Sequence, residues 1–197
     1  MSFEGCKKCS LCINQLPLVD KRVSADIMWV GLSAKKVEDI GTAIPLSNDT
    51  NSGKLIDNIE SGLGEFRFIK ANLVKCLPLD EQLKLRYPTT NEMKACYSNL
   101  KQEIIKVKPK VIFLLGMNVS KFILKEIEVA INGLDNKYDY SYFRHNDIYY
   151  VPIHHPSYIH IYKRKQIDQY ILGVQSIINE VYSINLTTKK DRVLEIA

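Results

Sequence analysis

Short apolar runs, bounded by polar residues, glycine or proline, recur along the chain. Their residues are rich in β-branched and aromatic types, which favour strands over helices. One of them, Val111–Leu115, is apolar at every position, as expected of a parallel strand that helices cover on both faces. The predicted strands are residues 26–31, 66–76, 110–116 and 148–153.

Segments of a helical character separate these runs. We expect Asn51 or Ser52 to cap the first helix and Thr89 or Thr90 to cap the second. The expected helices are residues 52 to about 62, 90–106, 118–129 and 161–182. This alternation predicts an α/β fold, a three-layer α/β/α sandwich with a central four-stranded parallel sheet.

Two segments between these elements show neither period. Residues 32–51 form a long connection, and such loops are usually functional or mobile. Residues 132–146 are rich in tyrosine and turn residues, which indicates a hairpin or a surface loop. The alternation of Tyr138, Tyr140 and Tyr142 there is typical of one face of a strand.

Length and composition indicate one domain. The chain has 197 residues, 46% of them hydrophobic, which is enough for one full α/β core. We expect the domain to span residues 1–182, with an N-terminal strap up to about Ser24 and a polar, loosely held tail at 183–197.

Charge and hydropathy indicate which kinds of binding partner the protein can have. The formal net charge of +5 suits a polyanionic partner such as a nucleic acid. No apolar run approaches the length that spans a membrane, and residues 1–5 lack the features of a signal peptide. We therefore expect a cytoplasmic protein without a membrane partner, and we take it to be a monomer.

The five cysteines need an explanation of their own. Cys6, Cys9 and Cys12 stand close together in the sequence, whereas Cys76 and Cys96 stand alone. In a protein without an export signal such residues are more often metal-binding or inert than disulfide-bonded. Their spacing fits an iron–sulfur cluster or a tetrahedral zinc site, with either Cys6 and Cys9 or Cys9 and Cys12 as the close pair.

Polar groups follow three of the four predicted strands. Residues 31–35 follow the first strand, Asn72 lies near the end of the second, and His155, Pro156 and Ser157 follow the last. Because the carboxyl ends of parallel strands meet at one edge of a sheet, we expect these groups to converge there. A buried amide needs partners or a purpose, and an imidazole can meet a developing negative charge.

These motifs, in this order, resemble the iron–sulfur uracil-DNA glycosylases of families four and five over residues 6–172. The resemblance implies a pocket that receives a uracil turned out of the DNA stack. The matching residues are Cys6, Cys9 and Leu11; Val30 and Gly31; Glu38 and Asp39; residues 53–57 and 72–76; Pro88, Thr89, Glu92 and Cys96; residues 109–112 with Leu115 and Gly116; and residues 155–157.

The resemblance also implies roles for individual residues. His155 would stabilise negative charge on the departing base, and Asn72 would bond uracil and reject cytosine. From the residues of this chain itself, Ser33 would at best orient water. Substrate contacts would come from Gly31, Leu32, Ala34, Lys35, Leu46, Asn72 and Ser157, partly through backbone amides near Ser33. DNA contacts would come from Lys54, Arg86, Ser157, Tyr158 and Ile159, with Tyr158 or Ile159 as a wedge. A [4Fe–4S] cluster would be held by Cys6, Cys9, Cys76 and Cys96, leaving Cys12 over.

The chain departs from the motifs of this family at three places. Residues 31–35 read Gly-Leu-Ser-Ala-Lys, so the proline and glutamate of the family are absent and Ser33 is the only hydroxyl. Leu46 stands where the family commonly stacks a phenylalanine on the base. Residues 77–95 lack the histidine with which one branch traps DNA covalently, and Lys84 and Arg86 there are phosphate contacts or part of a solvated face.

Two main hypotheses follow. The first is a DNA glycosylase that hydrolyses the N-glycosidic bond of uracil, or of a related damaged or modified pyrimidine, and leaves an abasic site. The alternative is a nucleic-acid-binding protein that keeps the fold and the iron–sulfur cluster with weak or no hydrolysis. A third hypothesis, a zinc-stabilised interaction protein, rests on the cysteines alone.

Overall fold

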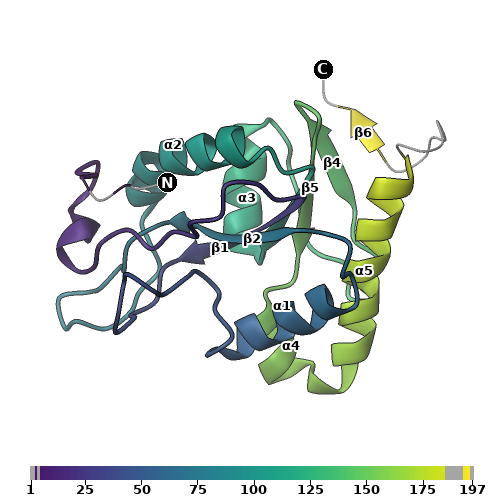
Figure 1. Ribbon diagram of the computed structural model, residues 1–197, viewed down its shortest axis with the longest axis horizontal. Coiled ribbons are helices and arrows are strands. Elements are labelled where there is room, and N and C mark those ends of the chain that lie inside the picture. Colours follow the sequence, from purple (N-terminus) through teal and green to yellow (C-terminus); the bar gives the residue numbers. More distant parts are fainter. Residues whose placement is uncertain (1–2, 4, 185–192, 196–197) are drawn as a thin grey trace.

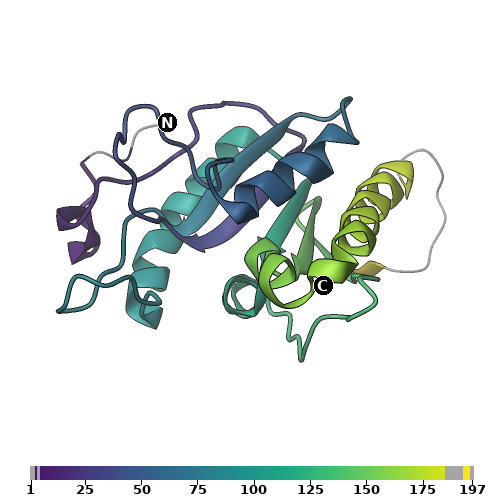
Figure 2. The same ribbon diagram turned by 90° about the horizontal axis from the view of Figure 1, so that it is seen from below.

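The computed structural model describes residue 3 and residues 5–184 and 193–195 as a sheet covered by helices on both faces (Figures 1 and 2). The strands are β1 (Ile27–Ser33), β2 (Phe68–Val74), β3 (Val111–Leu115), β4 (Tyr142–His145), β5 (Ile148–Ile153) and β6 (Val193–Glu195). The α-helices are α1 (Asn51–Ser61), α2 (Thr90–Val107), α3 (Met117–Glu126), α4 (Pro156–Tyr162) and α5 (Ile167–Ile184). Two short 3-10 helices, η1 (Ser10–Ile13) and η2 (Arg164–Gln166), complete the set.

The sheet has the strand order β2-β1-β3-β5-β4-β6. The four strands predicted from the apolar runs are its parallel part, since β1 pairs in parallel with β2 and β3, and β3 with β5. The predicted four-stranded sheet is therefore extended by two strands. β4 runs antiparallel to β5, and β6 pairs with β4.

Alternate residues of each parallel strand enter two separate hydrophobic cores. In β1, Met28 and Val30 join the core under α2 and α3, whereas Ile27 and Trp29 join the core under α1, α4 and α5. The residues of β1 to β3 and β5 are buried almost throughout, because helices cover both faces. The predicted three-layer α/β/α arrangement is thus confirmed.

The helix ends show which caps the chain uses. Thr89 caps α2 in a capping box with Glu92, as one of the two expected candidates. For α1 the expected caps, Asn51 and Ser52, were wrong: Thr50 accepts a hydrogen bond from the amide of Gly53 at 3.0 Å, and Ser52 is buried. The helix predicted at residues 161–182 is in fact three pieces, because α4 begins at Pro156 and ends at Tyr162, before η2 and α5.

The tyrosine-rich segment is a hairpin only at its end. Of the three alternating tyrosines, Tyr142 alone lies in a strand, and all three side chains are buried. Asn146 and Asp147 both have positive φ, as a two-residue turn between antiparallel strands requires.

The strap and the last described strand both contact the sheet. In the strap, Leu11 and Leu18 are buried, and the amide of Leu18 donates to the carbonyl of Lys75 at 2.8 Å. The tail at 183–197 was expected to be loosely held, but residues 183 and 184 continue α5 and Val193–Glu195 pairs with β4. The other tail residues, 185–192 and 196–197, lie outside the described part of the chain. Within the described residues no helix is long and apolar enough to cross a bilayer.

Glu92 supplies a test of how the long connection before α2 is held. Arg86 donates two hydrogen bonds to its carboxylate, at 2.8 and 2.6 Å, and the amide of Thr89 donates a third at 2.7 Å. These bonds lower the pKa of Glu92 to about 2. We expect Glu92→Gln to lower the free energy of unfolding by about 1 kcal/mol near neutral pH, since the capping box is weakened.

The pH dependence of that loss has a definite sign. The pKa of Glu92 is lower in the folded state, so its stabilisation is complete above the ordinary value of about 4.3 and is lost as pH falls toward 2. Denaturant unfolding between pH 2 and 7 should therefore show a gap between the native protein and Glu92→Gln that closes in acid. The exposed Glu81 provides the matched control, Glu81→Gln, and a gap that stayed constant down to pH 2 would count against the ion pair.

Candidate functional site

The carboxyl ends of the four parallel strands bring the predicted polar groups to one edge of the sheet. Gly31 of β1 stands opposite Asn72 of β2 in the register, and Leu115 of β3 stands opposite Ile153 of β5. His155 follows two residues after Ile153. The three predicted groups therefore lie on strands whose ends share this edge, with β3 between β1 and β5.

The first part of the site is a close approach between β1 and β2. A Cβ atom on Gly31 would lie 2.4 Å from Oδ1 of Asn72 and 3.4 Å from Cδ2 of Leu46, so only glycine leaves room for them. The Asn72 side chain is 3% exposed, and within the described residues its amide makes no hydrogen bond. Among the described residues, every side-chain polar atom that is fully closed off from solvent has a hydrogen-bond partner. Because the amide of Asn72 has none, its atoms must still reach solvent. Its hydrogen-bonding capacity is free for a ligand.

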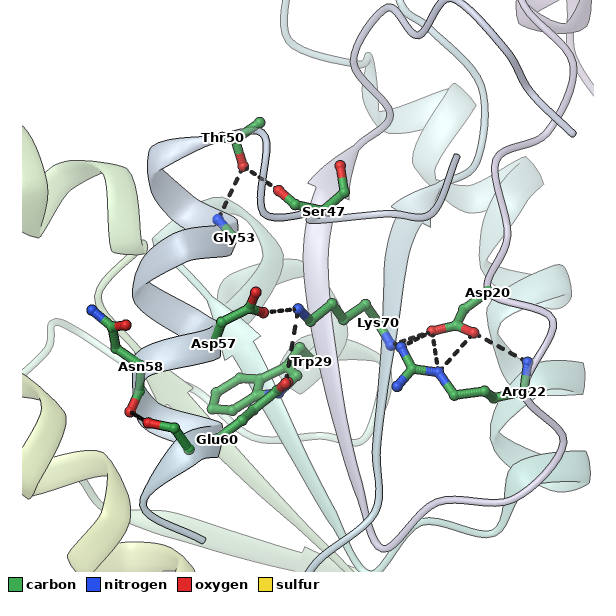
Figure 3. A network of polar contacts seen from close by, with 11 residues as sticks. Asp20, Arg22, Trp29, Ser47, Thr50, Gly53, Asp57, Asn58, Glu60 and Lys70 are labelled. Carbon is green, nitrogen blue, oxygen red and sulfur yellow. Dashed lines mark hydrogen bonds and ion pairs between the residues drawn. The ribbon is translucent and has the colours of Figure 1, made fainter. Parts of the chain in front are cut away.

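The loop after β1 holds Leu46 beside this amide. Leu46 has a φ of +53°, a backbone conformation that bulky residues rarely adopt and that costs of order 1–3 kcal/mol. The loop is fixed to the start of α1, where Thr50 Oγ1 donates to the carbonyl of Ser47 at 2.9 Å and accepts from Gly53 (Figure 3). A Cβ on Gly53 would lie 2.0 Å from the same carbonyl oxygen. The strained Leu46 is thus held in place by the packing of the loop on α1.

The second part of the site is the imidazole of His155. Its Nδ1 accepts a hydrogen bond from the backbone amide of Ser157 at 3.2 Å and contacts Oγ of Ser157 at 2.7 Å. A backbone amide can only donate, so Nδ1 carries no proton and the neutral ring carries its proton on Nε2. Burial lowers the pKa of His155, which favours that neutral form. The ring is therefore a neutral donor through Nε2.

Gly116 belongs to the site although the sequence analysis did not assign it a role there. It has a φ of +90°, and a Cβ on it would lie 3.2 Å from Cβ of His155. Its amide donates to the carbonyl of Ile153 at 2.8 Å, which fixes β3 against the end of β5. A glycine directly after a fully apolar strand was the available signal, because such a residue permits close contact between strand ends.

The comparison with known families decides what this edge belongs to. A family model described as "Uracil DNA glycosylase superfamily" matches residues 19–175, which contain Asn72 and His155. The chain belongs to this superfamily.

Individual relatives agree with that placement. The chain is 28% identical over 168 residues to a protein of Sulfurisphaera tokodaii named Type-4 uracil-DNA glycosylase, a match that covers 78% of this chain and 70% of that protein. The fold of the present chain is similar to that in the crystal structure of wild-type Pedobacter heparinus SMUG2. The TM-score is 0.58 and the identity 16%, over 81% of this chain and 77% of that chain.

Within this superfamily member, β1 runs farther than the sequence indicated. It continues to Ser33, which pairs with Val74, and the amide of Ala34 donates to the carbonyl of Val74 at 3.0 Å. Ala34 is buried, and its amide is therefore not free for a base or a phosphate, contrary to the expectation for this turn. Leu32 and Ser33 are half-buried at the strand end, and Lys35 forms an ion pair with Asp49 at 2.7 Å.

The predicted DNA contacts divide into those that face solvent and those that do not. Lys54 is exposed on α1, and Tyr158 is 38% exposed on α4. Ile159 is fully buried in the core, so the prediction that it enters DNA is wrong. Arg86 bonds the carboxylate of Glu92 and the carbonyl of Leu79, and its contact with phosphate stays a prediction.

Ser157 contacts the ring of His155. Its hydroxyl lies 2.7 Å from Nδ1 of His155, a contact that the sequence did not indicate, and its contact with phosphate stays a prediction. It is therefore a positioning residue for the imidazole. His155 and Ser157 are separated in the sequence by Pro156 alone, and the start of α4 at this proline brings their side chains together.

A second polar network ties α1 to β2 behind the site. Lys70 is 5% exposed and pairs with Asp57 and Glu60, while the indole of Trp29 donates to Glu60 at 2.8 Å (Figure 3). Burial raises the pKa of Glu60. Every charged group in this network has a partner, which is how a buried lysine becomes tolerable.

The five cysteines line one pocket at the end of the strap. Burial and the four other thiols raise the pKa of Cys76 to about 12. The amide of Lys75 donates to Sγ of Cys96 at 3.3 Å, and Nδ2 of Asn99 donates to Sγ of Cys6 at 3.4 Å. As they stand, no three or more Cys, His, Asp or Glu side chains in the described chain are arranged around a metal ion.

The tautomer and the pKa of His155 can be measured directly. We expect its imidazole to titrate below pH 6.5 with the proton of the neutral form on Nε2, because burial disfavours the charged ring. Nitrogen chemical shifts recorded over a pH series would report both properties. Since the unfolded state then binds the proton more readily, stability should fall as pH drops through the range below 6.5.

The Ser157→Ala variant is the matched control for that titration. It removes the hydroxyl contact and keeps the backbone amide that donates to Nδ1, so the Nε2–H tautomer should persist. A proton found on Nδ1 in the native protein would show that this hydrogen bond does not form.

Proposed function

We propose that this protein hydrolyses the N-glycosidic bond of uracil in DNA and leaves an abasic site. One observation carries the proposal. The same edge of the sheet holds a neutral imidazole that can donate a hydrogen bond and a buried amide that makes none within the described residues. The superfamily and the named relative support the same reaction class.

The imidazole suits the chemistry of base departure. As the glycosidic bond breaks, the sugar becomes cation-like and negative charge grows on the base, where a fixed donor stabilises it. A neutral imidazole is suited to that task, because it can donate a hydrogen bond through Nε2–H without changing its own protonation state. The hydrogen bonds from Ser157 hold the ring in that tautomer.

The amide of Asn72 suits the selection of the base. Its donor and acceptor match the edge of uracil, whereas cytosine presents the reverse pattern and would leave buried polar groups unpaired. Gly31 is part of this selection, since it gives Asn72 its place. The base must be turned out of the stack to reach this position.

Water activation is the weak point of the site. Ser33 is the only hydroxyl in residues 31–35, and a neutral hydroxyl orients water better than it deprotonates it. We therefore propose a slow enzyme. A related modified pyrimidine as the preferred base, or binding with little hydrolysis, is the second candidate, and the exchange of a stacking ring for Leu46 favours it.

The test is excision from an end-labelled strand with one uracil, followed by alkaline cleavage at abasic sites. Cleavage should occur at uracil and not at cytosine. We expect His155→Ala to lower the rate by about 10²- to 10³-fold, the usual loss on removal of one donor to a developing anion. Gly31→Ala should lower it as well, because the new methyl group collides with Asn72.

His145→Ala is the matched control, since His145 pairs with Ile148 at the opposite edge of the sheet. It should excise at the native rate. Full activity of His155→Ala would remove that imidazole from the mechanism, and absence of uracil cleavage by the folded native protein would favour the second candidate.

We further propose that the cysteine pocket holds a [4Fe–4S] cluster. The donor set fits, since five cysteines line one pocket and donors from Lys75 and Asn99 point at their sulfurs, as around clusters. A zinc ion held by four of the same thiolates is the alternative occupant of this pocket. The cluster would tie the strap to the end of β2 and serve stability; its proposed ligands are Cys6, Cys9, Cys76 and Cys96.

Metal content tests this assignment independently of activity. We expect protein purified without oxygen to contain about four iron and four sulfide per chain and to absorb visible light. Cys76→Ser should lose most of that absorbance, whereas Cys12→Ser, the matched control, should keep it. Zinc in place of iron, or equal loss in both variants, would contradict the assignment.

A further inference from the structure

A row of three aromatic side chains begins at His154, just before α4, and continues on that helix. Tyr158 and Tyr162 are four residues apart on α4, which places them on one side of the helix. The rings of His154 and Tyr158 are stacked, with centroids 5.6 Å apart and an interplanar angle of 16°. Tyr158 and Tyr162 follow at 5.4 Å and 41°. We call these three residues the ring row.

The ring row is anchored at its inner end and open at its outer end. Nδ1 of His154 lies 2.8 Å from the buried hydroxyl of Tyr140, and the hydroxyl of Tyr170 donates to the carbonyl of His154 at 2.9 Å. From this fixed ring the exposure rises to 38% at Tyr158 and 70% at Tyr162. Large rings at such exposure add little to the core, so the fold itself does not explain them.

Positive charge accompanies the ring row. Lys163 follows Tyr162 directly, and its charge adds to burial in lowering the pKa of His154. Arg164 and Lys165 are exposed next to it, and within the described residues none of these three cations forms an ion pair. Rings joined with unpaired cations are the combination that binds single-stranded nucleic acids, where rings take bases and cations take phosphates.

We propose that the ring row stacks unpaired bases of the strand beside the flipped uracil, and that single-stranded DNA is therefore the preferred substrate. This inference rests on the proposed function. In a duplex the neighbouring bases are paired and stacked on each other, so their faces cannot reach Tyr162. In a single strand the faces are free, and stacking tolerates any sequence because every base has one. The rings are held in place before binding, which limits the entropy lost when a strand binds.

The experiment compares two forms of one substrate. A short strand carrying 2′-fluoro-2′-deoxyuridine, in which the fluorine opposes positive charge on the sugar and slows cleavage, is bound alone and as a duplex, and fluorescence anisotropy gives each Kd. The native protein should bind the single strand more tightly. Tyr162→Ala should weaken single-strand binding by about 5- to 100-fold, which is the loss of one stacked base, and change duplex binding by less than about twofold.

Two variants control for other effects. Tyr162→Phe keeps the ring and should bind as the native protein does. Ile161→Ala removes a side chain that is 64% exposed on the same helix without removing a ring, and it should bind both forms normally. Because both positions are largely exposed, loss of folding does not enter the comparison.

The outcomes separate this inference from the proposed function. Equal weakening of both forms by Tyr162→Ala, or no weakening, would overturn the ring row as a single-strand site. A loss confined to the duplex would assign the rings to wedging instead and overturn it too. If uracil is not excised but binding to the single strand depends on Tyr162, the binding inference stands and the proposed hydrolysis fails.

Discussion

The side chain of Asn72 on β2 lies so close to Gly31 on β1 that a Cβ atom on Gly31 would stand 2.4 Å from its Oδ1. This contact decides where the amide of Asn72 points, and with it what the edge of the sheet can recognise. A shift of the strand by one residue would turn each buried side chain to the other face, so the two cores fix the register. In the proposed function, the specificity of the site would therefore depend on the packing of the whole sheet, which places Asn72 opposite Gly31.

The imidazole is placed with similar rigidity from the other side. His155 follows β5 and begins α4, and Gly116 lets the end of β3 come against it. Ser157, two residues on, fixes the tautomer. Groups held by strands and helix starts need little reorganisation as charge develops, and this is the usual source of catalytic stabilisation by fixed donors. The flexible parts of the chain contribute less: Leu46 reaches the site only in a strained conformation that α1 holds.

The sequence predicted the parallel part of the sheet because a buried parallel strand is an apolar run and little else produces one. It also placed Asn72 and His155 at one edge, because parallel order brings strand ends together. It failed where the outcome depends on where a helix begins. α4 starts at Pro156, which turns Tyr158 outward and Ile159 into the core, and no local pattern distinguished the two. Contacts between distant residues, such as β6 with β4, have no local signal either.

Leu46 and the ring row together suggest how a bound DNA strand would be contacted. An aliphatic side chain beside Asn72 gives the base less stacking than a ring would, so the base itself contributes less to binding. The exposed rings of Tyr158 and Tyr162 lie instead on α4. On the two proposals together, affinity would come mainly from the neighbouring strand, which stacks regardless of sequence, while discrimination would stay with the hydrogen bonds of Asn72. Such a site tolerates pyrimidines of different shape as long as their polar edge matches the amide, because shape is no longer what binds them.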